Sequence, residues 1–247
     1  MRPATNEWRL YTDLSWMWPI ISPPQAYVNE SQDVAHLINQ HSKEPVKTLL
    51  HLGCGGGHHD HSLQGHFDIT GIDINPGMLS LARKLNPRVT YLQGDMRSYR
   101  SNERFDAVLA ADSTNYMISE EELLATFATA YECLKPDGVF VVFAEYTLER
   151  FEPDSTRVSS HAAGNVEITY MENRYDPDPQ DTTFELTLVY LIRVAGRLQI
   201  ETDRHLCGVF PEETWSRTLR ESGFEIQEMS FDPTGTSPIF VCVKPGV

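Results

Sequence analysis

A stretch from residue 46 to residue 145 constrains the fold more than any other, because short apolar runs alternate in it with helical patterns. Apolar runs of this length are typical of buried strands, and the helices between them act as crossovers. Strands that are joined by crossover helices run parallel. We therefore expect a parallel sheet whose strands cover residues 46–52, 67–72, 89–93, 105–110 and 139–144.

Helices are expected before and between these strands. Residues 29–41 and 76–85 each place their apolar side chains on one side, which is the spacing of a helix packed on a core. Ser119 is followed three residues later by Glu122, and this pair is a capping box at the start of a further helix.

The pattern changes after Glu145, where strands follow one another with short turns between them. Consecutive strands with short connections pair antiparallel. The predicted strands are 165–173, 183–193 and 199–206. A helix over 211–222 with Gly223 at its C-terminal cap comes next. Two more strands, 224–231 and 239–243, are expected to close the main sheet as a hairpin.

Five parallel strands and this hairpin make seven. We therefore expect an α/β fold: a Rossmann-like, seven-stranded, mostly parallel sheet with helices on both faces, plus a small antiparallel β insert or lid. The expected divisions are an N-terminal helical lid at 1–45, a cofactor-binding core at 46–149, a substrate-covering insert at 150–208, and a C-terminal helix with strands that complete the sheet at 209–247.

Bulk properties exclude several classes of function. The net charge is −15 with no cluster of lysines or arginines, which disfavours a nucleic-acid partner. No apolar run approaches the ~18 residues that a membrane span needs. The N-terminus lacks a basic segment followed by an apolar stretch, as a signal peptide would have. The four cysteines form neither a disulfide framework nor a zinc pattern. We expect a cytoplasmic protein without membrane contact.

A glycine cluster follows the first predicted strand, where residues 53–57 read Gly-Cys-Gly-Gly-Gly. Glycine lets the backbone turn sharply and approach a ligand, and amides at the start of the next helix point at what binds there. Asp73 ends the second strand, 20 residues after Gly53. A carboxylate there can accept hydrogen bonds from both hydroxyls of a ribose. With Asp95 at the end of the third strand, the pattern predicts a nucleoside-containing cofactor, and a nicotinamide dinucleotide would share this logic.

Five ordered motifs resemble those of the class I S-adenosylmethionine-dependent methyltransferases, in particular the members that act on small molecules. The motifs are 49–57, 71–79, 93–96, 105–109 and 134–140. Residues 210–224 also resemble the penultimate helix of the small-molecule members. The resemblance covers about 46–145, and it favours methyl transfer over hydride transfer because of the Gly-Asp-Met and Lys-Pro-Asp-Gly segments.

The resemblance implies S-adenosylmethionine as the cofactor. The glycines would line its methionine part, Asp73 would bind the ribose, Ile74 would pack on the adenine, and Asp95 would accept from the adenine amino group beside the Met96 amide. The family usually has an acid where His51 stands, and a histidine could take over part of that role by hydrogen bonding. The expected cofactor residues are Tyr11, Trp16, His51, Gly53, Gly55, Gly57, Asp73, Ile74, Met78, Asp95, Met96, Ala111 and Asp112.

The acceptor is expected at the carboxyl ends of the strands. The loop 111–116 lacks the Asn/Asp-Pro-Pro-aromatic tetrad of base and protein-amide methyltransferases, which argues against nucleic-acid bases. Glu145 could hold an amine or accept a proton, and Tyr116 and His205 are the other catalytic candidates. In small-molecule relatives a Tyr-rich N-terminal helix and an insert cover the site. The expected acceptor contacts are Trp16, Ser113, Asn115, Tyr116, Glu145, Tyr146, Arg174, Tyr190 and His205.

Several histidines follow the glycine cluster and raise the question of a metal site. They are His58, His59, His61 and His66, with Asp60 between them. Adjacent residues diverge on a helix, and no distant carboxylate is evidently paired with them. We therefore expect a polar start of a helix near the cofactor and no metal.

The expected function is an S-adenosylmethionine-dependent methyltransferase that acts on a small molecule, at an amine or a hydroxyl, as a monomer or homodimer. Two alternatives stay open. One is different chemistry on the same cofactor, such as cyclisation of its side chain, which would release methylthioadenosine. The other is a non-catalytic partner subunit of the same fold, whose only support in the sequence is His51.

Overall fold

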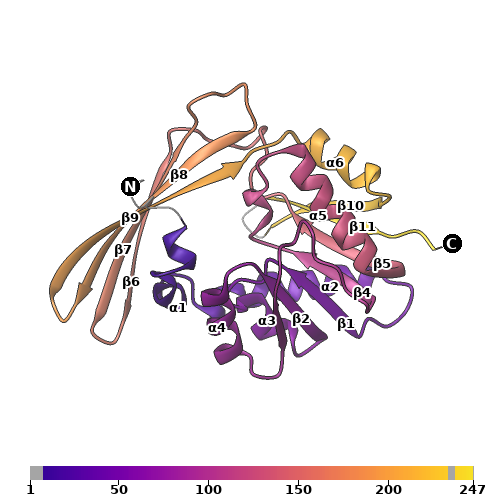
Figure 1. Cartoon of the computed structure of the whole chain (residues 1–247), viewed down its shortest axis with the longest axis horizontal. Coiled ribbons are helices and arrows are strands. Elements are labelled where there is room, and N and C mark those ends of the chain that lie inside the picture. The colour runs from indigo at the N-terminus through magenta and orange to yellow at the C-terminus, as the bar shows by residue number, and fades with distance from the viewer. Residues whose placement is uncertain (1–7, 233–236, 247) are drawn as a thin grey trace.

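A computed structural model describes residues 8–232 and 237–246, so the first seven residues of the expected N-terminal lid and the last residue lie outside the described part. The chain contains two sheets (Figure 1). The larger has seven strands in the order β10-β11-β5-β4-β1-β2-β3. These strands are β1 (Thr48–Leu52), β2 (Asp68–Asp73), β3 (Thr90–Gln93), β4 (Phe105–Ala110), β5 (Leu134–Phe143), β10 (Glu225–Phe231) and β11 (Pro238–Val243).

The main sheet is doubly wound. Strands β1 to β5 pair in parallel, while β11 runs antiparallel to both β5 and β10. The predicted mostly parallel sheet and its closing hairpin are thus confirmed. From β1 the chain moves outward through β2 and β3, and then returns to the other side of β1 for β4 and β5. The carboxyl edge between β1 and β4 is therefore the switch point at which ligand sites form in such sheets.

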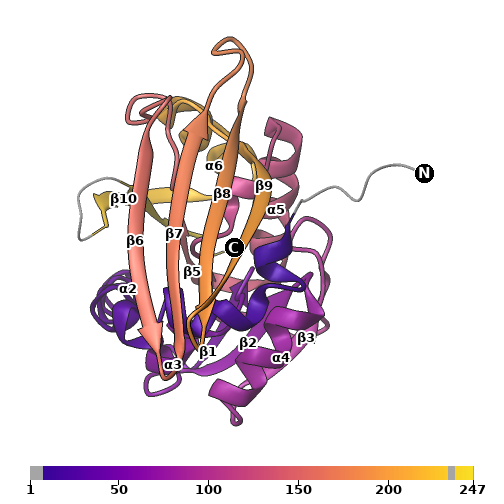
Figure 2. The same ribbon diagram turned by 90° about the vertical axis from the view of Figure 1, so that its left-hand side faces the viewer.

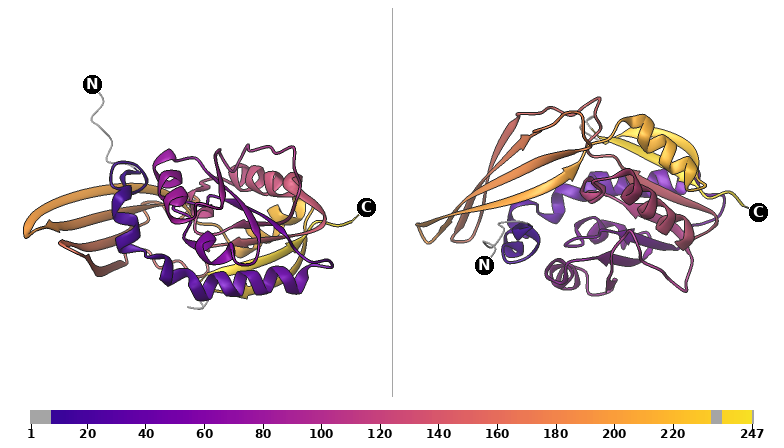
Figure 3. Two further views of the ribbon diagram at one scale, coloured as in Figure 1. Left: turned by 90° about the horizontal axis from the view of Figure 1, so that it is seen from below. Right: turned by 45° about the horizontal axis from the view of Figure 1, so that its top comes forward.

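Helices cover both faces of this sheet, as predicted (Figure 3). On one face, Val34 and Ile38 of α2 are completely buried against Leu49 and Val141. On the other face, Trp215 of α6 packs in the core cluster that α5 completes. None of the described helices is long and apolar enough to span a membrane. The α-helices beside the sheet are α2 (Val28–His41), α3 (His58–Leu63), α4 (Pro76–Leu85), α5 (Glu120–Cys133) and α6 (Glu212–Glu221).

Local sequence explains where two of these helices begin. The Asn75 side chain accepts hydrogen bonds from the amides of Gly77 and Met78 at the start of α4, as an N-cap residue does. At the start of α5, the Ser119 hydroxyl accepts from the amide of Glu122. The Glu122 carboxylate returns to the amide of Ile118 rather than to that of Ser119, so the predicted capping box forms with a shift of one residue.

The smaller sheet is antiparallel and separate from the main one, and Figure 2 shows its strands side by side, facing the viewer. Its strands, in spatial order, are β6 (Thr156–Ala163), β7 (Val166–Tyr175), β8 (Thr183–Val194) and β9 (Arg197–Gly208). Alternate residues of β8, from Phe184 to Ile192, are buried on one face. The predicted set of strands lacked β6, because β6 is an edge strand with mostly exposed residues and no apolar alternation.

The N-terminal segment fills the space between the two sheets (Figure 1). Leu10, Leu14 and Met17 are buried against the inner face of the smaller sheet. The Leu10 amide donates to Asp203, and Arg9 forms an ion pair with Glu201, so these bonds tie this segment to β9. The short helices of this segment are η1 (Arg9–Tyr11), η2 (Ser15–Met17), α1 (Trp18–Ile21) and η3 (Pro24–Tyr27). A further short helix, η4 (Thr114–Tyr116), lies in the loop after β4.

Candidate active site

The carboxyl ends of the parallel strands open into a cavity of about 600 Å³, called here the first cavity. Its walls come from the loops after β1, β2, β3 and β4 and from the N-terminal segment. It therefore lies at the switch point of the sheet, where a doubly wound fold binds its ligand.

The glycine loop after β1 forms the floor of the first cavity. Gly53 and Gly55 have φ of 69° and 52°, a backbone conformation that strongly favours glycine. A Cβ at Gly53 would lie 2.4 Å from the Ser113 side chain and 2.7 Å from Met96. Gly57 does not line the cavity. It precedes α3 with φ of 74°, and a Cβ there would meet Tyr91, so this glycine serves packing behind the loop.

Asp73 lies beside the glycine loop and lines the first cavity. One carboxylate oxygen accepts from the Gly55 amide and the other from the Asn75 amide, each at 2.8 Å. Burial raises the pKa of Asp73, and these two amides counteract part of that rise. An ionised carboxylate offers about four lone-pair positions, so about two remain for a ligand with paired hydroxyls.

His51 is buried under the glycine loop with one nitrogen left over. Its Nδ1 donates to Asp60 at 2.7 Å, and Tyr91 donates to the other oxygen of Asp60 at 2.8 Å. Asn86 donates both to Tyr91 and to the carbonyl of Gly57, so this network fixes the loop from below. Among the described residues His51 Nε2 has no hydrogen-bond partner. Because His51 lines the first cavity, Nε2 is available to a ligand there.

The loop after β3 carries an ion-pair network at the rim of the first cavity. Arg97 binds both oxygens of Asp95, the closest contact being 2.6 Å, and also pairs with Glu122. These bonds hold the pKa of Asp95 below its usual range, although burial opposes them. Asp95 remains in the cavity wall, and a ligand amino group would share its oxygens with Arg97.

A second cavity of about 600 Å³ lies under the smaller sheet. Carboxyl groups of Asp112, Glu145 and Glu172 line it. Glu145 Oε1 is buried and has no hydrogen-bond partner among the described residues. Burial raises the pKa of Glu145 well above its usual range, and the nearby Asp112 adds to the rise. The two cavities have five wall residues in common, which are Tyr11, Trp18, Tyr27, Asp112 and Tyr116. We call this shared wall the junction.

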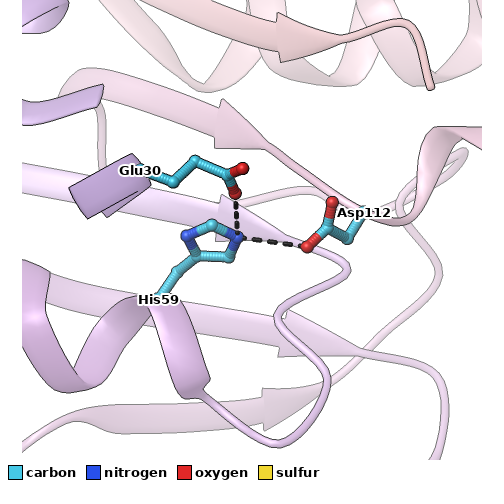
Figure 4. Close-up of side chains that lie close together, drawn as sticks. All are labelled: Glu30, His59 and Asp112. Atoms are coloured by element: carbon cyan, nitrogen blue, oxygen red, sulfur yellow. Dashed lines mark hydrogen bonds and ion pairs between the residues drawn. The ribbon is translucent and has the colours of Figure 1, made fainter. Parts of the chain in front are cut away.

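A histidine–carboxylate cluster supports the junction (Figure 4). His59 Nε2 lies 3.2 Å from Glu30 and 3.2 Å from Asp112, while its Nδ1 contacts Ser31. The carboxylates raise the pKa of His59 in spite of its burial, and burial raises the pKa of Glu30 to about 7. The ligand atoms of the three residues lie within 4.8 Å of one another, so they could surround a cation. Nε2 of His59 lies within reach of both carboxyl groups, so a hydrogen on this atom could also be shared between them.

The expectation that the histidines lack carboxylate partners is therefore wrong. His59 reaches Glu30 of α2 and Asp112 of the loop after β4, and His51 reaches Asp60. These partners are present because the imidazoles are buried, and a buried polar ring needs hydrogen-bond partners from the protein. The polar start of α3 is consequently part of the interior and not a solvated helix end.

Most of the predicted site residues lie in the walls of the two cavities. The first cavity has His51, Gly53, Gly55, Asp73, Ile74, Met78, Asp95, Met96, Ala111 and Ser113. The second has Asn115, Glu145, Tyr146, Arg174 and His205. Both have Tyr11, Asp112 and Tyr116. Ser113 was predicted to contact the acceptor, but it lies against Gly53 in the first cavity.

Besides Gly57, the predicted residues Trp16 and Tyr190 lie in neither cavity wall. Trp16 is 42% exposed, whereas its neighbour Met17 is the buried residue of η2 and Trp18 lines the first cavity. Tyr190 is fully buried and stacks on Tyr170 with ring centroids 5.8 Å apart. It belongs to the core between the smaller sheet and the N-terminal segment, so it is a packing residue.

Several wall residues were not predicted from the sequence. Trp18 and Tyr27 line both cavities, and His58 lines the first. Burial lowers the pKa of His58 to about 4, so the neutral ring stacks on Trp18 with centroids 5.9 Å apart. The Trp- and Tyr-rich composition of the N-terminal segment was the available signal, and only the fold shows which rings face inward.

Comparisons with known proteins agree with this geometry. A sequence model of the methyltransferase domain matches residues 49–138. The chain is 28% identical over 212 residues to dTDP-3-amino-3,6-dideoxy-alpha-D-glucopyranose N,N-dimethyltransferase of Streptomyces fradiae, covering 85% of this chain and 82% of that protein. It is 27% identical over 217 residues to dTDP-3-amino-3,4,6-trideoxy-alpha-D-glucopyranose N,N-dimethyltransferase of Streptomyces venezuelae, covering 85% and 88%. The crystal structure of Streptomyces venezuelae DesVI superposes with a TM-score of 0.82 at 26% identity, covering 95% of this chain and 96% of that one.

The fold and the first cavity define an enzyme that binds a nucleoside-containing cofactor at the switch point of a doubly wound sheet. The matched domain and the relatives that cover most of the chain specify the class of this enzyme. The chain is a class I S-adenosylmethionine-dependent methyltransferase.

The first cavity fits this cofactor on three observations. The Gly53 backbone forms a cradle that a Cβ would fill. The Asp73 carboxylate faces the cavity with about two lone-pair positions to spare. The unpartnered Nε2 of His51 supplies a polar contact at the loop, where related enzymes usually carry an acid.

Proposed function

We propose that the enzyme methylates the amino group of a small molecule, and specifically of a deoxyamino sugar that is carried on a nucleoside diphosphate. The observation that carries the proposal is the junction, where a cavity suited to the cofactor and a cavity lined by carboxyl groups and arginines share five wall residues. A methyl donor and an acceptor bound in these two cavities would meet there.

In this proposal the residues of the first cavity hold S-adenosylmethionine. Asp73 would bind the ribose hydroxyls, Ile74 and Met78 would contact the adenine, and His51 Nε2 would accept from the ammonium group of the methionine end. Nδ1 of His51 donates to the buried carboxylate of Asp60. In this proposal the other ring nitrogen, Nε2, therefore presents a lone pair to the cofactor. When bound, the cofactor supplies a methyl carbon on a sulfonium, to which the acceptor nitrogen bonds as the carbon–sulfur bond breaks and its electron pair passes to sulfur.

The second cavity has the charges that an amino sugar nucleotide requires. Asp112 at the junction and Glu145 beside it can bind an ammonium group. Arg150, Arg157 and Arg174 line the second cavity but not the first, and arginine binds phosphate oxygens well. An acceptor with its amine at the junction and its diphosphate among the arginines would use both sets.

The relatives support an amine rather than a hydroxyl as the nucleophile. The two Streptomyces relatives are by name N,N-dimethyltransferases of dTDP-3-amino sugars. A neutral amine attacks with its own lone pair, whereas an ammonium ion must first lose a proton, which Glu145 or a neighbour can receive. The aromatic side chains of the junction would also help to keep water from the reacting atoms.

We assign the remaining parts of the chain by the same reasoning. Residues 1–45 would act as the lid, 46–149 as the cofactor-binding core, 150–208 as the cover of the acceptor, and 209–247 as the completion of the sheet. The four cysteines are free and buried, which suits a reducing compartment, and the net charge of −15 disfavours nucleic-acid acceptors. We propose a cytoplasmic enzyme that works as a monomer or homodimer.

The direct test is an assay with purified enzyme, S-adenosylmethionine and dTDP-3-amino-3,6-dideoxyglucose. We expect S-adenosylhomocysteine in proportion to N-methylated sugar. The matched control acceptor has a hydroxyl in place of the amine and should not react. Methylation of that hydroxyl sugar would refute the choice of nucleophile. Release of methylthioadenosine would indicate other chemistry, and failure to bind the cofactor would indicate a non-catalytic subunit.

A pair of variants tests the carboxyl groups. Asp112→Asn and Glu145→Gln should each raise KM for the amino sugar about tenfold or more, because each removes a charge-assisted contact worth about 1.5–3 kcal/mol. The dissociation constant for S-adenosylhomocysteine should change little in Glu145→Gln, since Glu145 lines only the second cavity. Glu225→Gln, on the exposed start of β10, is the control. Equal KM values in all variants would contradict the placement of the amine.

A further inference from the structure

Four side chains form a hydrogen-bonded line from the junction into the smaller sheet. The hydroxyls of Tyr11 and Tyr116 are 2.5 Å apart. Tyr116 Oη lies 3.1 Å from His205 Nδ1, and His205 Nε2 lies 2.9 Å from Asp203 Oδ2. We call these four residues the buried relay. It joins η1, η4 and β9, which are far apart in the sequence.

The direction of every bond in the relay follows from its inner end. The side chains of Asp203 and His205 are completely buried. Asp203 also accepts from the Leu10 and Arg204 amides. Although burial opposes ionisation, the bond from His205 and the backbone amides keep the pKa of Asp203 below its usual range, so Asp203 is an acceptor only. His205 Nε2 must then carry the hydrogen. In the relay that we infer, His205 has room for a second proton, so Nδ1 is an acceptor before the transfer.

The outer half of the relay is fixed in turn. Because His205 Nδ1 accepts, Tyr116 must donate to it, and the oxygen of Tyr116 is left to accept from Tyr11. The oxygen of Tyr11 then keeps its lone pairs for a donor at the junction, where Tyr11 lines both cavities. Burial raises the pKa of Tyr11 and of Tyr116 well above the usual range, so both hydroxyls remain neutral and can pass a proton without storing it.

We propose that the buried relay removes the proton that the acceptor ammonium must lose before methyl transfer and delivers it to His205. This inference rests on the proposed function and deepens it, because it assigns the proton acceptor. Glu145 then has the separate task of binding the ammonium in the second cavity, and His205 acts through the two tyrosines as a positioning and proton-storing residue.

The step balances in protons and electrons. The ammonium N–H bond breaks, and its electron pair stays on nitrogen as the nucleophile. Its proton goes to Tyr11 as Tyr11 gives its own to Tyr116, and Tyr116 gives its own to His205 Nδ1. The product of the transfer is an imidazolium that donates to Asp203 through Nε2 and to Tyr116 through Nδ1. Because both ring nitrogens of His205 are bonded, the proton returns by the same relay to Tyr11, which lines both cavities, when the acceptor has left.

Other groups face the relay and enter its electrostatics. Trp8 stacks on the His205 ring, with centroids 5.0 Å apart and planes inclined by 14°. Arg9 lies beside Asp203 through its backbone amide. The remaining titratable groups that act on members of the relay are Glu145, Cys207 and Tyr190. Of these, Glu145 is the one that could compete for the proton, and the experiment must distinguish transfer to Glu145 from transfer along the relay.

The test compares single-turnover rates across pH for wild type, Tyr116→Phe and His205→Gln with the amino sugar acceptor. At pH values where the free acceptor is an ammonium ion, both variants should be slower by about a hundredfold or more, which is the range of general-base catalysis. The deficit should shrink as the pH rises towards the pKa of the acceptor, because the amine then arrives already neutral. Tyr131→Phe and His161→Gln, which lie outside both cavities, are the matched controls.

Two results would overturn the proposal. A deficit of the same size at every pH would mean that the relay only supports the structure, and wild-type rates in the variants would mean that Glu145 or water takes the proton. Tyr116→Phe removes a single hydroxyl and keeps the ring contacts, so it remains informative if His205→Gln fails to fold. Unchanged affinity for S-adenosylhomocysteine confirms that the variants are folded.

A second measurement does not depend on the identity of the acceptor. Nitrogen-15 chemical shifts of His205 in the free enzyme should show hydrogen on Nε2 and a hydrogen-bonded, unprotonated Nδ1. The Nδ1 shift should move in Tyr116→Phe. Hydrogen on Nδ1 of neutral His205 would reverse the relay and refute it. If wild type methylates no amine but this tautomer is found, the proposed function fails while the polarity of the relay stands.

Discussion

Replacement of Asp73 by alanine tests the cofactor site most directly. The wild-type carboxylate accepts from the Gly55 and Asn75 amides at 2.8 Å each, which leaves about two lone-pair positions for the two ribose hydroxyls. Each charge-assisted hydrogen bond is worth about 1.5–3 kcal/mol. Water that enters the vacated space will replace part of this. We expect a net loss of about 1.4–3 kcal/mol, which weakens binding about 10- to 150-fold.

Calorimetric titration with S-adenosylhomocysteine, and separately with S-adenosylmethionine, measures this loss. Asp73→Asn should weaken binding as well, because its amide group loses the charge and turns a donor towards the Gly55 or Asn75 amide. Asp68→Ala, at the exposed start of the same strand, should bind both ligands like wild type. If Asp73→Ala keeps the wild-type dissociation constant, the ribose is not bound where we place it, and the roles assigned to the glycine loop fail with it.

Three further predictions test the packing and the charges of the site. Gly53→Ala should lower cofactor affinity at least tenfold, because its Cβ would lie 2.4 Å from Ser113, whereas Gly164→Ala, also at positive φ but with nothing within 4 Å, should bind normally in the same titration. Asp60→Ala should destabilise the protein by about 3–5 kcal/mol in urea unfolding, because it leaves a buried histidine and a buried tyrosine unpaired; unchanged stability would contradict the network under the loop. Burial raises the pKa of Glu30 to about 7, so folding favours its protonated form, and wild-type stability should fall, by at most about 3 kcal/mol, as the pH rises from about 4.5 to 7. Glu30→Gln should lack this loss in unfolding curves at both pH values, and an identical pH dependence would show that another group titrates.

A metal-removal experiment checks the histidine–carboxylate cluster. Since Nε2 of His59 lies 3.2 Å from both carboxyl groups and a hydrogen there can satisfy them without a metal, we expect dialysis against EDTA to leave the methyl transfer rate unchanged. Loss of activity that Mg²⁺ or Mn²⁺ restores would show that the cluster holds a cation.

The fold was predictable because its signals are local in the sequence. Alternation of apolar runs with helical periods indicated the parallel sheet, and the turn at 134–138 indicated the strand after it, whose pairing with β4 only the structure shows. Asp73 could be placed without coordinates, since the carboxyl ends of neighbouring parallel strands share one edge. The strand β6 was missed because exposed edge strands need no apolar alternation.

The remaining parts of the site depend on contacts between distant segments. His59 and Asp112 are 53 residues apart, and no local pattern pairs them. Trp16 was named as a candidate although Trp18 lies in the cavity walls, because short 3₁₀ turns have no helical period from which an inward face can be predicted. Tyr190 alternates inward on β8 as expected for that strand, but the N-terminal segment covers its position and makes it core.

The shared wall at the junction links the binding of the two ligands thermodynamically. Tyr11, Trp18 and Asp112 each belong to both cavities, so a ligand that orders these side chains from one side changes the surface that the other ligand meets. Such coupling is reciprocal in free energy. The factor by which S-adenosylhomocysteine tightens or loosens the acceptor must equal the factor by which the acceptor changes the affinity for S-adenosylhomocysteine. A product complex in which this factor is large would leave slowly, and the rate of turnover would then be set by release and not by methyl transfer.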